Sequence, residues 1–175
     1  MSYLNGEKIV LVTAHRRESF GTDMKNICLA VKEMARTFKD MVFVYPVHLN
    51  PNVREVVNET IRGVANIHLI EPLGYQDFIH LMKKSFLILT DSGGIQEEAP
   101  FFDVPVLVMR NKTERLEGVE AGVAMLVGTD KKQIIDGVTR LIESSELYNA
   151  MAKSISPYGD GNASKYIVTE ILEDV

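Results

Sequence analysis

The stretch Phe86–Glu98 reads FLILTDSGGIQEE and joins an apolar run to a turn and a helical pattern. Its first part, Phe86–Thr90, is apolar at almost every position, which is typical of a strand covered on both faces of a parallel sheet. Ser92 follows with a pair of glycines, residue types that favour a helix cap and a tight turn. A helical pattern then continues from Gly94 to Phe102. The stretch therefore predicts a buried strand that turns directly into a helix.

The same alternation of strand and helix runs through the rest of the chain. Further apolar runs are predicted strands: Lys8–Thr13, Met41–Tyr45, Ile67–Ile70, Val104–Val108 and Met125–Val127. Amphipathic segments with helical spacing cover residues 24–38, Tyr75–Lys84, Lys131–Ser144, Glu146–Ser154 and Ala163–Asp174. Strands that alternate with helices imply right-handed crossovers. We therefore expect one α/β domain over residues 1–175, with an open, doubly wound, mainly parallel six-stranded sheet.

Several predicted helices begin after a side chain that caps helices. Asn50 precedes Pro51, and proline is favoured as the first residue of a helix. Asp130 and Ser145 precede two further helical segments. We therefore expect Asn50, Asp130 and Ser145 to be N-caps.

Composition and charge argue against several classes of protein. Hydrophobic residues make up 46% and charged residues 25%, the balance of a soluble globular protein, and the net charge of −5 argues against a general nucleic-acid binder. The single cysteine, Cys28, has no partner for a disulfide or a zinc cluster, and it falls on the apolar face of a predicted helix. No apolar run approaches the roughly 18 residues of a membrane span, and the N-terminus lacks a signal pattern. We therefore expect a cytoplasmic protein without a membrane segment or a metal site.

The loops that follow the strands carry the residues suited to chemistry, because ligands of doubly wound sheets bind beyond the carboxyl ends of the strands. Thr13–Gly21 follows the first strand and holds His15, Arg16 and Arg17. Arginine offers forked donors that suit phosphate, and histidine exchanges a proton near neutral pH. A solvated charged turn is the alternative. His48, after the second strand, is a weaker candidate of the same kind.

The turn after the fourth strand is the sharpest local signal for an anion site. Its glycines let a ligand approach free backbone N–H groups, and the start of a helix favours negative charge. Glu97 and Glu98 lie about one turn further on, where a carboxylate suits a pair of ribose hydroxyls. A Ser-capped helix without a ligand is the alternative. The turn matches neither the dinucleotide-binding fingerprint nor a P-loop.

The loop after the fifth strand offers more cationic side chains. Arg110 or Arg115 would complete a diphosphate clamp. Alternatively, both would pair with Glu114 and Glu117 at the surface, for little gain in stability.

The loop after the third strand, Glu71–Phe78, suits a planar base. It is a rigid loop that offers backbone amides and carbonyls, together with an aromatic ring for stacking. Phe78 also lies at helical spacing from Tyr75 and Met82, which favours a place in the core as the alternative.

Blocks of sequence covering nearly the whole chain, taken together, resemble the non-hydrolysing UDP-N-acetylglucosamine 2-epimerase family. The blocks are Thr13–Gly21 (TAHRRESFG), Tyr45–Val53 (YPVHLNPNV), Leu89–Pro100 (LTDSGGIQEEAP), Pro105–Glu117 (PVLVMRNKTERLE), Glu120–Thr129 (EAGVAMLVGT) and Pro157–Ser164 (PYGDGNAS). The resemblance implies a Rossmann-like domain that forms one half of a two-domain GT-B architecture, with the active site between the halves. It further implies that this chain corresponds to the carboxyl-terminal domain alone, without the amino-terminal domain of comparable size.

The resemblance also implies roles for individual residues. His15 would contact the diphosphate and the reacting sugar, as the catalytic residue of this domain. The UDP pocket would comprise Leu73, Phe78, Ser92, Gly93, Gly94, Glu98 and Arg115. Within it, the Ser-Gly-Gly turn would bind the phosphates, Glu98 the ribose, and the Leu73 region the uracil. Arg16 and His48 match positions implicated in binding a second UDP-GlcNAc as an activator.

The chain departs from the family pattern at Leu116 and Asp103. Leu116 stands where the family usually has proline, which would alter the loop that bears Arg115. Asp103 stands where glycine is usual, in a turn before a strand, and aspartate is also tolerated there.

The activity implied by the resemblance is interconversion of UDP-GlcNAc and UDP-ManNAc at C2, without a cofactor, for cell-envelope polysaccharide synthesis. UDP would be eliminated to leave a 2-acetamidoglucal and then added back, with the proton delivered to the other face. The acid/base carboxylates at the sugar would come from the amino-terminal domain, so we expect the isolated chain to bind UDP and not to epimerise. Family members are commonly dimers, which makes the full-length protein a candidate homodimer. A fragment of a GT-B glycosyltransferase and a non-catalytic nucleotide-binding module stay open as alternatives.

Overall fold

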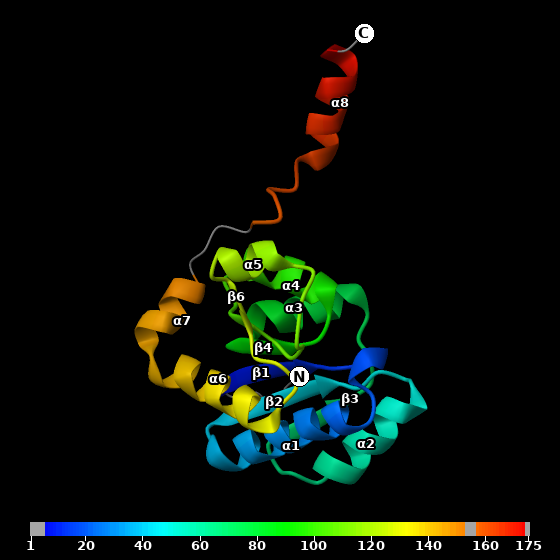
Figure 1. Ribbon diagram of the computed structural model, residues 1–175, viewed down its shortest axis with the longest axis vertical. Coiled ribbons are helices and arrows are strands. Elements are labelled where there is room, and N and C mark those ends of the chain that lie inside the picture. Colours follow the sequence, from blue (N-terminus) through cyan, green and yellow to red (C-terminus); the bar gives the residue numbers. More distant parts are fainter. Residues whose placement is uncertain (1–5, 153–156, 174–175) are drawn as a thin grey trace.

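A parallel sheet lies at the centre of the fold (Figure 1). The computed structural model describes residues 6–152 and 157–173. The strands are β1 (Lys8–Thr13), β2 (Met41–Pro46), β3 (Ile67–Ile70), β4 (Leu87–Thr90), β5 (Val106–Val108) and β6 (Ala124–Leu126). They form one six-stranded sheet in the order β3-β2-β1-β4-β5-β6, and every neighbouring pair is parallel. This is the order of a Rossmann-like sheet, so the predicted fold class is confirmed.

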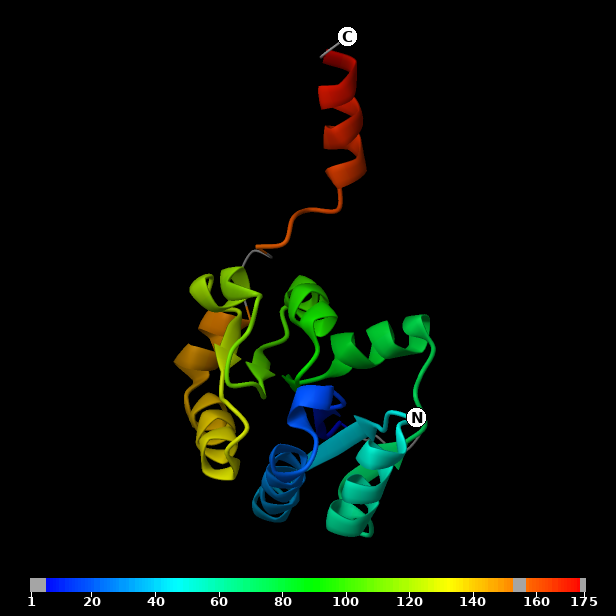
Figure 2. The same cartoon turned by 45° about the vertical axis from the view of Figure 1, so that its right-hand side comes forward.

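Helices cover both faces of the sheet (Figures 1 and 2). They are α1 (Thr22–Thr37), α2 (Pro51–Ile61), α3 (Tyr75–Lys84), α4 (Gly93–Glu98), α5 (Leu116–Glu120), α6 (Lys131–Glu143), α7 (Ser145–Met151) and α8 (Ala163–Glu173), with short 3₁₀ helices η1 (Arg17–Ser19) and η2 (Ala99–Phe102). Residues of α1, α2, α6 and α7 share one apolar core with the sheet, and residues of α3, α4 and η2 share the other. The sheet is therefore doubly wound.

Successive side chains of a strand point to opposite faces, and the apolar runs supply both cores for this reason. In β1, Val10 and Val12 join the core under α1, whereas Ile9 and Leu11 join the core under α3. Cys28 lies in the first core with no exposed surface, and burial raises the pKa of its thiol to about 12. Its predicted place as a small buried hydrophobe is confirmed.

The predicted helix starts are confirmed at two positions and wrong at a third. The Asn50 side chain accepts a hydrogen bond from a backbone N–H of the first turn of α2, and Asp130 accepts two in α6. The N-cap of α7 is Ser144 rather than Ser145, because the Ser144 hydroxyl accepts from the Leu147 N–H at 3.1 Å. Neighbouring serines offer the same cap, and local pattern does not choose between them.

Other predicted element bounds also differ in detail. The predicted helix over Gly94–Phe102 is α4 followed by the tighter η2. The short α5 was not predicted, because its sequence LEGVE is polar and contains a glycine. The predicted helix ends at Ser154 and Asp174 lie outside the described residues.

The order of the strands reverses between β1 and β4, which creates a switch point at the carboxyl edge of the sheet. Thr13 ends β1 and Thr90 ends β4, and the two residues are in register. Their hydroxyl oxygens lie 2.7 Å apart and form a buried hydrogen bond. The loops that leave these threonines therefore begin side by side, which places the candidate site.

Candidate functional site

Asp91 joins the two loops at the switch point. It follows β4 directly and has no exposed surface. Its Oδ2 atom accepts hydrogen bonds from the backbone N–H groups of His15 and Arg16, each at 2.8 Å. The loop after β1 is also held from β2, because the buried Tyr45 hydroxyl donates to the Ala14 carbonyl at 2.7 Å. Asp91 is not among the site residues predicted from the sequence, although an acid that directly follows a buried strand is a usable signal.

His15 lies in the loop after β1, beside Asp91, with 38% of its side chain exposed. Its ring stacks on His48, with centroids 5.1 Å apart and planes 10° apart. Burial lowers the pKa of His15, Asp91 opposes that shift, and His48 and Arg16 lower it further. The structure thus brings together two histidines that were singled out for different roles.

The Ser92-Gly93-Gly94 turn begins α4 as predicted, but Ser92 does not cap the helix with its side chain. The Ser92 N–H donates instead to the Thr90 hydroxyl at 3.0 Å, which holds the turn against the end of β4. The first residues of a helix have no intrahelical acceptor for their N–H groups. The turn therefore presents backbone donors and a hydroxyl, which suit an anion.

Charged side chains close over Gly93. A Cβ atom at this position would lie 3.2 Å from Arg16 Nη2 and 3.2 Å from Glu114 Oε1, and it would also approach Arg115. Such contacts are tighter than ordinary van der Waals packing. A methyl group at this position would therefore displace the ends of these flexible side chains by a few tenths of an ångström.

The arginines of the site are held by carboxylates of the same chain. Arg110 donates to Glu18 at 2.8 Å and to Glu114 at 2.7 Å, and only 8% of its side chain is exposed. Arg16 reaches Glu114 at 3.5 Å, and Arg115 donates to Glu97. The alternative ion pairs with Glu114 are confirmed for Arg110 and, at 3.8 Å, for Arg115, and Arg115 is also bound by Glu97 of α4. Arg110 is thus buried and held by two carboxylates, whereas the side chains of Arg16 and Arg115 are partly exposed to solvent.

The loop that bears Arg115 is anchored to α4. The Thr113 hydroxyl donates to the buried Gln96 side chain at 2.7 Å and accepts the Arg115 N–H at 3.1 Å. Glu98 lies on the same helix and is half-buried, and both burial and its neighbour Glu97 raise the pKa of Glu98. Backbone donors, guanidinium groups and carboxylates thus gather around the turn at Gly93, which suits a phosphorylated ligand with hydroxyl groups.

A family model described as UDP-N-acetylglucosamine 2-epimerase matches residues 1–172. The chain belongs to this family. Its matches include a probable UDP-N-acetylglucosamine 2-epimerase of Ralstonia solanacearum, which is 55% identical over 170 residues, 97% of this chain and 45% of the relative. The chain therefore spans about half the length of the curated epimerase relatives it matches.

Solved structures agree with this family. The UDP-GlcNAc 2-epimerase of Neisseria meningitidis, determined with UDP-GlcNAc bound, is 51% identical with a TM-score of 0.93, and the match covers 97% of this chain and 46% of that one. The C-terminal domain of a glycosyl transferase group 1 protein of Francisella tularensis has a TM-score of 0.68 at 17% identity, over 91% of this chain and 86% of that domain. The second likeness shows a shared fold alone, so the sequence relationship lies with the epimerases.

The epimerase residues expected near uracil lie on the side of the sheet that carries α3. Leu73 and Phe78 are half-buried and pack against the core there, whereas 68% of Tyr75 is exposed. The alternative of core packing therefore holds in part for Phe78. Leu73 lines a cavity of about 340 Å³ with Asp77 and His80. Phe78 is not among the residues that line this cavity.

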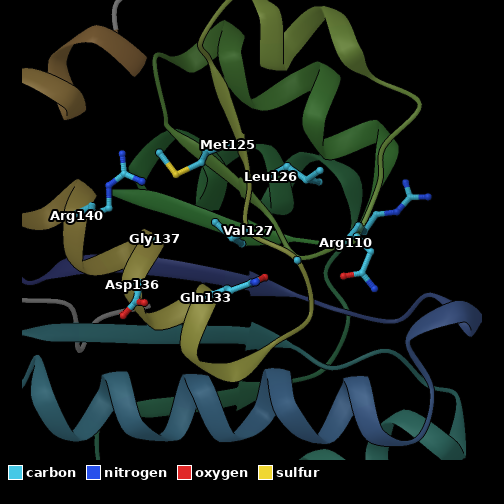
Figure 3. A pocket seen from close by; sticks show the side chains of 10 residues that line it. Arg110, Met125, Leu126, Val127, Gln133, Asp136, Gly137 and Arg140 are labelled. Atoms are coloured by element: carbon cyan, nitrogen blue, oxygen red, sulfur yellow. The ribbon is translucent and has the colours of Figure 1, made fainter.

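A different cavity, of about 460 Å³, follows the edge strand β6 (Figure 3). Arg110 and Arg140 lie at its opposite ends, and Met125 and Gln133 line it between them. Of the residues predicted to bind a ligand, it includes only Arg110, whose side chain is already engaged by Glu18 and Glu114. The predicted epimerase site is thus the open carboxyl edge at the switch point, and this edge cavity is separate from it.

The described residues contain no group of three or more His, Cys, Asp or Glu side chains arranged to hold a metal ion. Within the same residues, no helix has the length and apolar character needed to cross a membrane.

Proposed function

We propose that this chain is the UDP-binding half of a UDP-GlcNAc 2-epimerase that interconverts UDP-GlcNAc and UDP-ManNAc. The observation that carries the proposal is the junction of the β1 and β4 loops. There Arg16, His15 and the Ser-Gly-Gly turn meet at the carboxyl edge of a doubly wound sheet. Membership of the epimerase family and the nucleotide named with a related structure support UDP as the ligand.

The diphosphate would bind at the turn that begins α4. The N–H groups of Gly93 and Gly94 and the Ser92 hydroxyl would donate to its oxygens. Arg115 would supply a forked cation, and it would exchange its present partner Glu97 for the ligand. The intramolecular carboxylates thus keep the guanidinium groups in place before the ligand arrives.

The remainder of the nucleotide would spread over the neighbouring loops. Glu98 would accept hydrogen bonds from the ribose hydroxyls, and the uracil would lie near Leu73 and Phe78. Arg16 and His48 would contact a second UDP-GlcNAc that acts as an activator. Because His48 stacks on His15, such an activator would touch the ring that faces the substrate.

The proposed reaction removes UDP from C1 and a proton from C2 to leave a 2-acetamidoglucal, and then adds UDP back to C1 with a proton delivered to the other face of C2. This half would stabilise the negative charge that develops on the departing UDP, through backbone donors and guanidinium groups set in advance. The groups that move the proton at C2 would come from an amino-terminal half, which fits the doubled length of the relatives. We therefore infer that the isolated chain binds UDP and does not epimerise.

A nuclear magnetic resonance titration of the chain with UDP tests the site. Amide shifts are expected to cluster at residues 13–18, 72–78, 92–98 and 113–117. Uridine, which lacks the diphosphate, is the matched control and should leave residues 92–94 unmoved. Shifts elsewhere, or none at millimolar UDP, would contradict the assignment. Turnover of UDP-GlcNAc by the isolated chain would instead contradict its inactivity.

A further inference from the structure

Asp91 has one carboxylate oxygen whose bonding is complete and one whose bonding is not. Its Oδ2 atom accepts the N–H groups of His15 and Arg16. Its Oδ1 atom is buried and has no hydrogen-bond partner among the described residues. The nearest cationic group is the His15 ring, whose Nδ1 lies 3.6 Å from Oδ1. A buried, unsatisfied carboxylate oxygen is costly, and a donor from His15 would satisfy it after a small rotation of the ring.

The orientation of the His15 ring follows from its neighbours. Stacking on His48 fixes the plane of the ring, and Asp91 lies at the edge that bears Nδ1. The groups that face the ring are Asp91 from the loop after β4, His48 from the loop after β2, and Arg16 from its own loop. Because Nε2 lies across the ring from Nδ1, it points away from Asp91.

We propose that Asp91 is a positioning residue for His15: its Oδ1 atom holds the proton on Nδ1, so that Nε2 is the nitrogen that gains and loses a proton. The inference rests on the proposed contact of His15 with the diphosphate. A neutral His15 then presents a lone pair at Nε2, and a protonated His15 presents a donor there to an anionic oxygen. In both states the carboxylate keeps the ring in one tautomer and stabilises its charged form, as carboxylates that orient histidines do in other sites.

The test measures which His15 nitrogen carries the proton. Long-range ¹H–¹⁵N correlation spectra of the full 175-residue chain, recorded without nucleotide above the His15 pKa, distinguish the two tautomers. The wild-type ring is expected to carry its proton on Nδ1. A ring with its proton on Nε2 would overturn the proposal by itself, without any variant.

The proposal predicts that Asp91→Asn reverses the tautomer of His15. The two backbone N–H groups need an acceptor, so the amide oxygen takes the place of Oδ2 and the amide NH₂ group faces Nδ1. Nδ1 must then accept, which moves the proton to Nε2 and lowers the pKa of His15. His48→Ala removes the stacked ring and leaves Asp91 in place, so it should keep the proton on Nδ1. An unchanged tautomer in Asp91→Asn, in a chain whose other amide shifts match the wild type, would overturn the proposal.

These spectra are independent of the proposed function. A chain that fails to bind UDP still reports the tautomer of His15, so failure of the UDP titration and failure of the Asp91 proposal are separate results. Where both hold, UDP should shift the Nε2 resonance of the wild type more than that of Asp91→Asn.

Discussion

At the switch point, Asp91 is fully buried and connects positions 76 residues apart. Asp160, just before α8, is exposed and accepts hydrogen bonds from its own segment. Asp91 accepts the His15 and Arg16 amides. Asp160 accepts the Asn162 N–H and the Tyr166 hydroxyl, and bonds from these residues lower the pKa of Asp160 to about 2. Tertiary contacts thus shape the candidate site, and local hydrogen bonds shape α8.

The two regions also differ in what their apolar residues contact. No residue of α8 is buried, and Tyr166, Ile167, Val168, Ile171 and Leu172 are each at least 55% exposed. Both views show α8 apart from the sheet (Figures 1 and 2). Clustered exposed apolar residues mark surfaces that contact other molecules. Because no residue of α8 is buried, we expect the sheet to fold without contacts from α8. The candidate site, in contrast, is held together by contacts between loops of the sheet.

A pair of matched leucines gives the largest expected difference. Leu141 in α6 has no exposed surface, and Leu172 in α8 is 70% exposed. Leu141→Ala should lower the free energy of unfolding by about 3 kcal/mol, because it removes buried methyl groups and leaves a cavity. Leu172→Ala should leave the urea midpoint unchanged. A comparable loss in both variants would show that α8 packs on the domain.

Substitution of Asp91 and of Asp160 tests the same difference between the two regions, with a smaller expected effect on stability. Asp91→Ala removes the acceptor of two partly buried N–H groups and should cost about 2 kcal/mol of stability. Asp160→Ala should not move the midpoint of chemical unfolding, because the group is exposed. Equal losses in the two variants would contradict the distinction between tertiary and local bonding.

Matched arginines test the site rather than the fold. Arg115 lies beside Gly93, whereas Arg140 lies at the far end of the edge cavity. Arg115→Ala should weaken UDP binding about 10-fold, the loss of one charge-assisted hydrogen bond. Arg140→Ala should leave the dissociation constant unchanged in the same calorimetric titration. An equal effect of both substitutions would mean that net charge alone attracts the nucleotide.

Features with local causes could be predicted from the sequence, whereas features that depend on tertiary contacts could not. Local signals predicted the apolar strands and the caps at Asn50 and Asp130, because their causes lie within a few residues. Asp91 was missed because its function requires β1 and β4 to be neighbours, which strand order alone decides. The Glu97 partner of Arg115 was missed for a similar reason, since an ion pair 18 residues apart depends on how the loop after β5 returns to α4.

The pH dependence of stability tests the surroundings of His15. Burial lowers the pKa of His15 in the folded chain, so protonation favours the unfolded state. Neutral His15 therefore makes its full contribution to stability above its pKa in the unfolded chain, about 6.5. This contribution is lost as the pH falls through the lower pKa that His15 has in the folded chain. The wild type should therefore lose more thermal stability between pH 7 and pH 5 than His15→Gln. Bound UDP should reduce this loss, because an anion beside the ring favours its charged form.

Substitution of Asp103 has the smallest expected effect on stability. This residue lies in the turn between η2 and β5. It is the one non-glycine residue with positive φ among residues 6–152 and 157–173, at φ 56°. A side chain in this conformation is strained. Asp103→Gly should raise the free energy of unfolding by about 0.5 kcal/mol, with the gain limited by the added freedom of the unfolded chain. Asp40→Gly, at an exposed turn outside this conformation, should bring no gain, so equal gains in urea denaturation would contradict the strain at Asp103.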